Sequence, residues 1–180
     1  MIRKRQNDAF LEWIRTYDAI LRKIARAYAP FGEHEDLHQD LLIALWHAVP
    51  LYRAQAKPST FIYRVALNCA MNWTRNRARY LQRHVELGEQ ATRLPAAPNA
   101  QREGSGDRER LVEKLYAALA TLPDADRSLA LLHLDALSYR EIAEVLGITE
   151  NNVGVKLNRV RKRLAEQLRQ MEHEGKGNVK

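Results

Sequence analysis

The side chains best suited to chemistry in this 180-residue chain are cations near its C-terminal end, where five occur without an acid between them. They are Lys156, Arg159, Arg161, Lys162 and Arg163. Guanidinium and ammonium groups neutralise phosphates and bond guanine edges, so this stretch is suited to binding a nucleic acid. The alternative is a basic helix face that is only solvated.

A second cationic stretch, residues 61–83, combines arginines with aromatic rings and lacks any Asp or Glu. The residues concerned are Phe61, Tyr63, Arg64, Trp73, Arg75, Arg77, Arg79, Tyr80 and Arg83. Aromatic rings stack on unpaired bases while guanidinium groups hold the phosphates, so the mixture indicates a surface for single-stranded nucleic acid. By itself the segment also fits a core helix with a solvated basic face.

A third pattern, His34-Glu35-x-x-His38, spells the zinc-hydrolase motif, in which two histidines bind the metal and the glutamate activates water. Here Asp36 stands between the histidines, and no following Gly/His or acidic motif offers a third ligand. Acids in the first turn of a helix also complement the helix dipole without any metal. We therefore expect no metal, no cofactor and no catalytic site. We expect this helix to present an acidic and polar face to a protein partner.

The C-terminal cations must be held by local structure, and the residues around them predict a helix-turn-helix. Ser138 and Glu141 form a capping box at the start of a helix, and Gly147 supplies the left-handed residue of a sharp turn. Thr149 caps a second helix. Its apolar residues recur at helical spacing, at Val153, Leu157, Val160 and Leu164. In a helix-turn-helix such a second helix enters the major groove of DNA.

Helical periodicity also runs through the rest of the chain, and no strand pattern occurs in the sequence. Between about Val85 and Arg108 the periodicity disappears, and proline and glycine predict a flexible linker. The fold class is therefore all-α, with two small helical domains on a tether. The expected boundaries are a first domain at 1–84, a linker at 85–108, a helix-turn-helix domain at 109–172 and a disordered tail at 173–180.

The distribution of charge along the chain indicates the class of ligand. The formal net charge is +7, and the excess lies in residues 1–83, where 14 Lys and Arg accompany 7 Asp and Glu. A second basic surface in that half favours two separate contacts with a polyanion.

No apolar run is long enough to cross a membrane and the N-terminus lacks the core of a signal peptide, so we expect a cytoplasmic protein without membrane insertion. The single cysteine, Cys69, excludes an internal disulfide and is expected to be a small buried residue.

Four segments, taken in order, resemble regions 2 and 4 of the extracytoplasmic-function (ECF) sigma factors of bacterial RNA polymerase. They are EDLHQDLLIALW, STFIYRVALNCAMNWTRNR, LPDADRSLALLHLDALSYREIAEVLG and NVGVKLNRVRKRL, and the resemblance spans about residues 10 to 170. It implies a non-catalytic subunit that brings core RNA polymerase to promoter DNA and helps to melt it. An anti-sigma protein is a further partner that the family allows. The resemblance specifies neither the promoter sequence nor the inducing signal.

The resemblance implies three sets of site residues. The set that docks on the polymerase is Asp36, Leu37, Gln39, Asp40, Leu45 and Trp46. The set that recognises and opens the minus-ten element is Tyr52, Arg53, Lys57, Phe61, Tyr63, Arg64, Asn68, Arg75, Arg77 and Arg79. The set that binds the duplex minus-thirty-five element is Asn151, Asn152, Val155, Lys156, Asn158, Arg159 and Lys162.

Two departures from the family pattern bear on these sets. Phe61 stands where the family usually has tryptophan, and it keeps an aromatic face for stacking. Gly154 and Val155 occupy positions where the family commonly places a basic residue and a small polar one. Val155 offers only methyl contact, for example to a thymine. Base reading is then expected from Asn151, Asn152, Asn158 and Arg159.

Two rival functions remain open at this point. A two-domain transcriptional regulator would use the same helix-turn-helix on duplex DNA without binding polymerase, so polymerase binding separates it from a sigma factor. A zinc hydrolase would use His34, Glu35 and His38, and metal analysis of the purified protein separates it.

Overall fold

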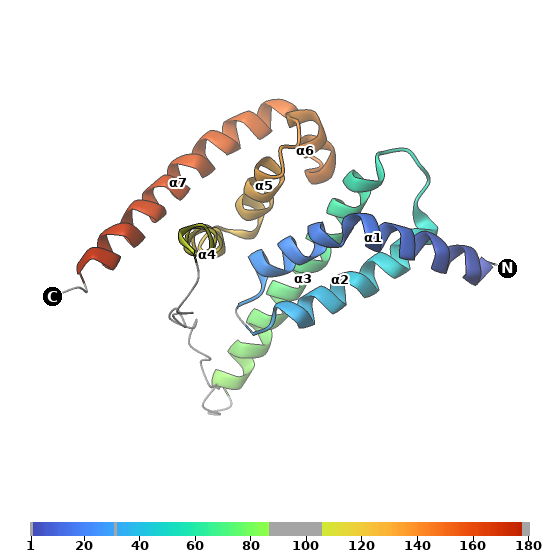
Figure 1. The fold of residues 1–180 in the computed structure, drawn as a ribbon, viewed down its shortest axis with the longest axis horizontal. Helices are drawn as coiled ribbons and strands as arrows, with labels where there is room; N and C mark the ends of the chain where they lie inside the picture. The colour runs from blue at the N-terminus through green and yellow to red at the C-terminus, as the bar shows by residue number, and fades with distance from the viewer. Residues whose placement is uncertain (1, 31, 87–105, 178–180) are drawn as a thin grey trace. The chain divides into compact units, whose positions relative to one another are not determined.

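The computed structural model describes residues 2–30, 32–86 and 106–177, and its elements in these ranges are all helices (Figure 1). In chain order they are α1 (Ile2–Tyr28), α2 (His34–Ala48), the 3-10 helix η1 (Val49–Leu51), α3 (Pro58–Glu86), α4 (Asp107–Ala120), α5 (Asp124–Leu134), α6 (Tyr139–Leu146) and α7 (Glu150–Gly177). They form two compact units: α1 to α3 make unit 1, and α4 to α7 make unit 2. The all-α class predicted from periodicity is confirmed within the described ranges.

Unit 1 is a bundle in which α1, α2 and α3 pack on one another around an apolar core. The largest side chains of that core are almost fully buried, and they are Leu21, Ile24, Leu37, Leu41, Leu45, Ile62 and Leu67. Burying one side chain of this size stabilises a fold by about 1.5–3 kcal/mol. Because each helix turns its apolar side inward, the opposite sides of α2 and α3 are fixed towards solvent.

Unit 2 packs α4, α5 and α6 against α7. Its core is equally apolar, with Leu119, Leu129, Leu132, Ile142 and Leu157 buried. The long helix α7 is the common support, so its first turns have a fixed orientation relative to α6.

A buried cation joins α4 to α5. Arg127 is 7% exposed, and its Nε donates to the carbonyl oxygen of Leu119 at 3.1 Å. Its Nη2 donates to the carbonyl oxygens of Ala120 at 2.8 Å and Leu122 at 2.9 Å. The last carbonyls of a helix have no partner within that helix. Arg127 therefore caps the C-terminal end of α4 from the following helix.

The helix-turn-helix predicted from the sequence is confirmed in α6 and α7. Ser138 Oγ accepts a hydrogen bond from the Glu141 N–H at 3.3 Å, and Glu141 Oε2 accepts one from the Ser138 N–H at 3.0 Å, which completes the capping box. Gly147 has φ 67° at the end of α6. Thr149 Oγ1 accepts from the Asn152 N–H at 3.3 Å at the start of α7.

Two predicted boundaries fall partly outside the described residues. The expected linker at 85–108 overlaps the ends of α3 and α4, and its central part, 87–105, is not described. The tail at 173–180, expected to be disordered, is helical as far as Gly177, and 178–180 are not described. A nucleated helix gains one hydrogen bond for each residue added, which favours continuation of α7 beyond its packed turns.

Ala136 closes the end of α5 with φ 59°, a left-handed conformation that glycine adopts without steric cost. Its N–H donates to the His133 carbonyl at 3.0 Å, and the Leu137 N–H donates to the Leu132 carbonyl at 3.2 Å. This is the hydrogen-bond pattern of a helix end that normally uses glycine. Ala136→Gly should therefore raise the free energy of unfolding of unit 2 by about 1 kcal/mol.

The two units can be followed separately in the full chain, because Trp13, Trp46 and Trp73 are its three tryptophans and all lie in unit 1. In a urea titration, circular dichroism reports both units and tryptophan fluorescence reports unit 1. Ala136→Gly should move the dichroism transition to higher urea and leave the fluorescence transition in place. The matched control Ala117→Gly, on the exposed side of α4, should lower the stability of unit 2 by about 1 kcal/mol. A loss of stability from both variants would contradict the left-handed assignment.

Candidate partner and nucleic-acid interfaces

The exposed side of α2 carries most of the acids that the sequence singles out. Asp36, Gln39 and Asp40 are exposed, and Ile43 is 55% exposed. The sequence interpretation misses Ile43, although its spacing of three residues from Asp40 places both on one side of the helix. We call these four side chains the α2 face. It is acidic at one end and apolar at the other.

Three members of the predicted polymerase-docking set lie elsewhere. Leu37 and Leu45 are 0% and 1% exposed in the core of unit 1, where they hold α2 in place. Direct contact of either leucine with a partner is contradicted by this burial, since the apolar period of α2 turns both inward. Trp46 is half-buried and stands edge-on to Phe10 of α1, with ring centroids 5.1 Å apart.

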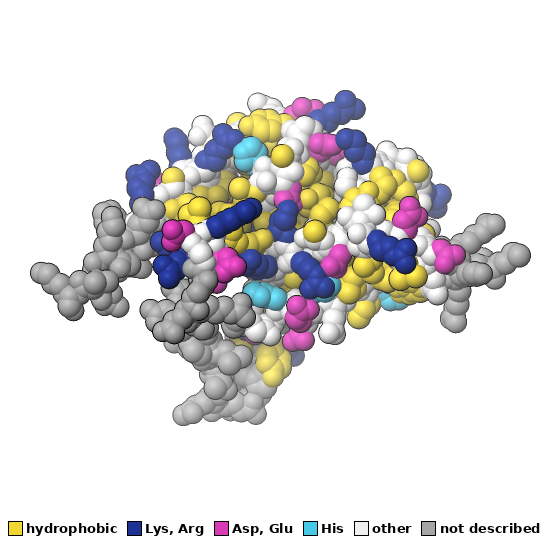
Figure 2. All heavy atoms as spheres, viewed as in Figure 1, with side chains coloured by type: hydrophobic (Ala, Val, Ile, Leu, Met, Phe, Trp, Pro, Cys, Tyr) yellow, Lys and Arg dark blue, Asp and Glu magenta, His cyan; other side chains and the backbone are white. Residues whose placement is uncertain are grey.

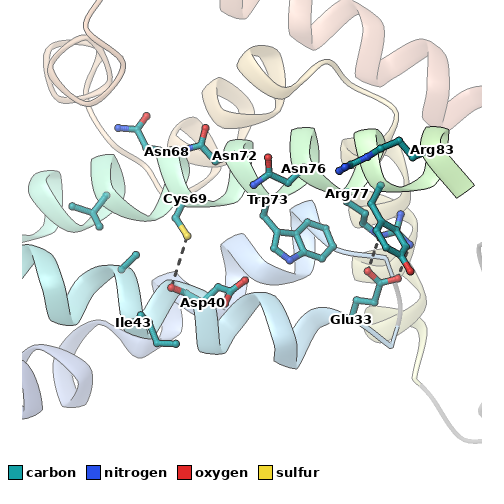
Figure 3. A pocket seen from close by; sticks show the side chains of 13 residues that line it. Glu33, Asp40, Ile43, Asn68, Cys69, Asn72, Trp73, Asn76, Arg77 and Arg83 are labelled. Atoms are coloured by element: carbon teal, nitrogen blue, oxygen red, sulfur yellow. Dashed lines mark hydrogen bonds and ion pairs between the residues drawn. The ribbon is translucent and has the colours of Figure 1, made fainter.

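A groove of about 930 Å³ runs between α2 and α3 (Figure 3). Asp40 and Ile43 line it from α2, and Cys69 and Trp73 line it from α3. Cys69 Sγ lies 3.8 Å from the Asp40 carbonyl oxygen, and burial together with the Asp40 charge raises the pKa of the thiol. Cys69 is therefore protonated at neutral pH, and it packs as a small residue that is half-buried rather than buried.

Arg77 and Glu33 tie the start of α2 to α3. Arg77 Nε donates to Glu33 Oε2 at 2.6 Å, and its Nη2 donates to Glu33 Oε1 at 2.5 Å. Figure 3 shows the two side chains meeting at one end of the groove, beside Trp73, whose ring centroid is 5.7 Å from the guanidinium carbon. A two-pronged pair of this kind fixes both side chains. Arg77 is therefore paired with Glu33 in this structure, and its predicted phosphate contact stays a prediction.

The residues of the zinc motif serve the packing of α1 on α2. His38 Nε2 lies 2.7 Å from Asp18 Oδ1, and Arg22 Nε donates to Asp18 Oδ2 at 2.6 Å. Burial works to raise the pKa of Asp18, but the hydrogen bonds from Arg22 and His38 outweigh it and the pKa falls below its ordinary value. Burial lowers the pKa of His34, and Glu35 lies 3.6 Å from Arg22. In the described part of the chain, no three His, Cys, Asp or Glu side chains gather in a way that would hold a metal.

The loop after η1 is braced by a cluster of three aromatic rings. The ring centroids lie 5.0 Å apart for Trp13 and Tyr52, 5.3 Å for Tyr52 and Phe61, and 6.0 Å for Trp13 and Phe61. Tyr52 Oη donates to the Ala56 carbonyl at 2.8 Å, and Ala54 between them has φ 55°. Strained residues that their surroundings hold in place cluster at ligand sites. The ring contacts and the hydrogen bond therefore hold this loop in one conformation, with the half-exposed rings of Tyr52 and Phe61 at its base.

Polar side chains continue from this loop along one side of α3. Those exposed are Arg53 and Lys57 in the loop and Arg64, Asn68, Arg75 and Arg79 on the helix. Spacings of four and seven residues place the last four on one side of α3 over about 22 Å. Together with Tyr52 and Phe61 we call them the loop–α3 surface. Tyr63 does not belong to it: the side chain is 5% exposed in the core, which contradicts its predicted stacking on a base.

The exposed side of α7 presents the predicted duplex-binding set. Asn151, Asn152, Val155, Asn158, Arg159 and Lys162 are exposed, and Lys156 is half-buried. We call these seven side chains the α7 face. Val153, Leu157 and Val160 alternate with them at helical spacing and are buried in the core of unit 2. Val155 is 66% exposed, so its methyl groups are available to a ligand.

The cations of α7 are not equivalent, although the sequence presents them as one run. Arg161 Nη2 donates to His133 Nε2 at 2.7 Å, and Arg163 Nη1 donates to Asp126 Oδ2 at 2.7 Å, so both reach back to α5. Arg159 Nη2 lies 3.9 Å from Asp126 Oδ1. Figure 2 shows the same mixture more widely, with acidic side chains among the Lys and Arg of the visible face. On the face that Figure 2 shows, acidic and basic side chains are therefore interspersed.

Two family models match this chain, and they match it in order. Sigma-70 region 2 matches residues 13–80, and Sigma-70, region 4 matches residues 112–164. The first match contains the α2 face and the loop–α3 surface. The second contains α5, α6 and the α7 face.

Curated proteins are similar along most of the chain. The ECF RNA polymerase sigma factor SigW of Bacillus subtilis (strain 168) is 28% identical over 176 residues, which cover 94% of both chains. The ECF RNA polymerase sigma factor SigE of Mycolicibacterium smegmatis is 31% identical over 156 residues, covering 84% of this chain and 58% of that protein. The ECF RNA polymerase sigma-E factor of Escherichia coli (strain K12) is 24% identical over 165 residues, covering 89% and 86%.

Two solved structures share the fold. The sigma factor RpoE from Bartonella quintana, in complex with the anti-sigma factor NepR, has a TM-score of 0.69 and 22% identity, and the match covers 89% of this chain and 96% of that one. CnrH, in complex with the cytosolic domain of CnrY, has a TM-score of 0.63 and 19% identity, covering 91% and 90%. At these identities the likeness establishes the fold alone.

Proposed function

Because the chain belongs to the ECF group of the sigma-70 family of RNA polymerase sigma factors, we propose that its two units divide the work of initiation between them. The chain directs promoter recognition and transcription initiation, as its regions 2 and 4 indicate. In this proposal unit 1 docks on core polymerase and opens the minus-ten element, and unit 2 binds the duplex minus-thirty-five element. The relatives are regulatory rather than catalytic proteins, and we assign no catalytic site to this chain.

One observation carries the division: each unit has its own core and exposes a different kind of polar surface. The loop–α3 surface combines aromatic rings with arginines, which suits unpaired bases. The α7 face combines amides with cations on the second helix of a helix-turn-helix, which suits the edges and phosphates of a duplex. A regulator that binds only duplex DNA does not require the loop–α3 surface. A zinc hydrolase requires neither the loop–α3 surface nor the α7 face.

Contact with core polymerase is assigned to the α2 face. Asp36 and Asp40 favour a basic partner, and Ile43 supplies an apolar contact beside them. Gln39 adds a hydrogen-bonding group between the charges. Leu37 and Leu45 support this face from the core, and Trp46 supports it through α1.

The melted strand is assigned to the loop–α3 surface. Flipping a base out of the stack costs a few kcal/mol, and stacking on an aromatic ring returns about 1–3 kcal/mol for each base. The half-exposed rings of Tyr52 and Phe61 can therefore offset the flip of one base. The surrounding cations and amide then hold the strand through its backbone, and they are Arg53, Lys57, Arg64, Asn68, Arg75 and Arg79.

The duplex element is assigned to the α7 face. Asn151, Asn152, Asn158 and Arg159 carry the groups that bond base edges. A bidentate contact of an Asn or Arg with a base discriminates by about 1–3 kcal/mol. Val155 offers its methyl groups to a thymine, and Lys156 and Lys162 are assigned to phosphates.

Further partners follow from the same family. The related RpoE structure holds the anti-sigma factor NepR, and we infer that this chain too has an anti-sigma partner. We place its action in the cytoplasm because core polymerase works there. In the described part of the chain, none of the helices combines the length and the apolar character needed to span a bilayer.

The function is tested by run-off transcription with core polymerase and genomic templates, with and without this protein. New transcripts that require both the protein and core polymerase are expected. The DNA segment upstream of each new start site is then taken from the same templates and used as the promoter fragment in later binding assays. Binding to duplex DNA without any polymerase-dependent transcript would instead support the regulator that does not bind polymerase.

A further inference from the structure

Two arginines of α7 share one carboxylate on α5. The Asp126 side chain is 9% exposed, and Arg163 and Arg159, four residues apart on α7, approach its two oxygens. Arg163 Nη1 is at hydrogen-bonding distance from Oδ2, 2.7 Å, whereas Arg159 Nη2 stands 3.9 Å from Oδ1. One arginine is bonded and the other is held by charge alone.

The two contacts have different physical consequences. A buried carboxylate is costly unless it is paired and hydrogen-bonded, and Arg163 meets that need with a charge-assisted bond. Arg159 is not required for it. The Arg159 side chain is 56% exposed on the α7 face, next to Asn158, so little free energy is lost when its guanidinium leaves Asp126 for a stronger anion.

We propose that Asp126 is a positioning residue for duplex recognition, which keeps Arg163 bonded to α5 and orients Arg159 on the α7 face. The inference rests on the proposed function of α7. In the free chain Asp126 orients Arg159, and on DNA the guanidinium of Arg159 exchanges to a phosphate or a guanine edge. Arg163 stays on Asp126, so the DNA meets fewer mobile cations than the sequence provides.

This arrangement makes Asp126 a determinant of specificity. Contacts between cations and phosphates supply affinity for any duplex, and each one steepens the dependence of the logarithm of the affinity on the logarithm of the salt concentration by about 0.9. Withholding Arg163 lowers that general affinity and leaves the base contacts intact. The ratio of affinities for the promoter element and for unrelated DNA therefore rises.

The test uses Asp126→Asn, which keeps the shape of the side chain and one acceptor but removes its charge. Holoenzyme is titrated with a promoter fragment identified by run-off transcription and with an unrelated duplex of equal length, over a range of salt concentrations. The variant should bind the unrelated duplex about three- to ten-fold more tightly at low salt, with a salt slope steeper by about 1. Its preference for the promoter fragment should fall by a similar factor.

Three further variants isolate the cause. Asp124→Asn removes the same charge from the same helix, at a carboxylate that lies 3.8 Å from Arg127 of α5, and it should leave the slope unchanged. Arg163→Met leaves Arg159 as the remaining partner of Asp126, so binding to both duplexes should weaken, opposite in sign to Asp126→Asn. When Arg159→Ala is added to Asp126→Asn, the gain in duplex affinity that comes from Arg159 should be lost. The gain that comes from the released Arg163 should remain.

The outcomes separate this inference from the function on which it rests. A folded Asp126→Asn variant whose slope and preference match wild type, or match Asp124→Asn, overturns the role of Asp126. If Asp126→Asn does not fold, a gain in duplex affinity on Arg163→Met overturns it instead. If Arg159→Ala and Asn158→Ala leave promoter binding unchanged in the wild-type background, it is the assignment of duplex binding to α7 that fails.

Discussion

Replacing Arg127 by methionine is expected to lower the free energy of unfolding of unit 2 by about 3–5 kcal/mol. Methionine preserves the apolar stem of the side chain but has no donor. The carbonyl oxygens of Leu119, Ala120 and Leu122 would lose the bonds from Arg127 at the end of α4. Since Arg127 is 7% exposed, water cannot readily replace those bonds.

Urea unfolding of the full chain distinguishes this effect from a general loss of stability. Circular dichroism should show an early transition for unit 2, while tryptophan fluorescence, which reports unit 1, keeps the wild-type midpoint. The control Arg140→Met removes an exposed arginine from α6 and should change stability by less than about 0.5 kcal/mol. A change below about 1 kcal/mol for Arg127→Met, or an equal shift in fluorescence, would contradict the capping role.

Reversing one charge on the α2 face is expected to have the largest effect on binding. Asp40→Arg should weaken the affinity for core polymerase about ten- to a hundred-fold, which corresponds to about 1.4–2.8 kcal/mol. The side chain of Asp40 is exposed, and its main-chain carbonyl, not its carboxylate, contacts Cys69. The fold should therefore survive the change.

Titration of core polymerase with labelled protein measures the affinity, and circular dichroism checks the fold. Asp8→Arg is the matched control, because it makes the same charge change at an exposed position of α1. It should bind core polymerase about as well as wild type. Equal affinities for Asp40→Arg and wild type would exclude the α2 face from the interface.

The elements that could be predicted from sequence are those that short-range chemistry decides. Ser138 and Glu141 are three residues apart, and Gly147 needs only its own backbone to adopt φ 67°. The start of α6, the turn and the start of α7 can therefore be predicted from local sequence. Ala136 was not, because it adopts a left-handed conformation with a residue type that gives no signal of it.

The errors at the candidate site arise from contacts between distant parts of the chain. No local pattern around Arg77 indicates its pairing with Glu33, which lies 44 residues earlier and across the groove. Tyr63 carries an aromatic ring on a basic stretch, and only the packing of α3 turns it inward. Trp13 lies on α1, Tyr52 follows η1 and Phe61 lies on α3, so no local sequence pattern places the three rings together.

The central claim is that unit 1 opens the minus-ten element of the promoter and unit 2 binds the duplex minus-thirty-five element. It is tested most directly on a template whose start site is already melted, with transcription measured for Asn68→Ala and Arg159→Ala beside wild type. Both residues are exposed, so neither change should disturb a core. The bubble removes the cost of opening, and so it should restore part of the activity of Asn68→Ala. The defect of Arg159→Ala should persist on the same template. Equal rescue of the two variants, or rescue of neither, would contradict the division between the units.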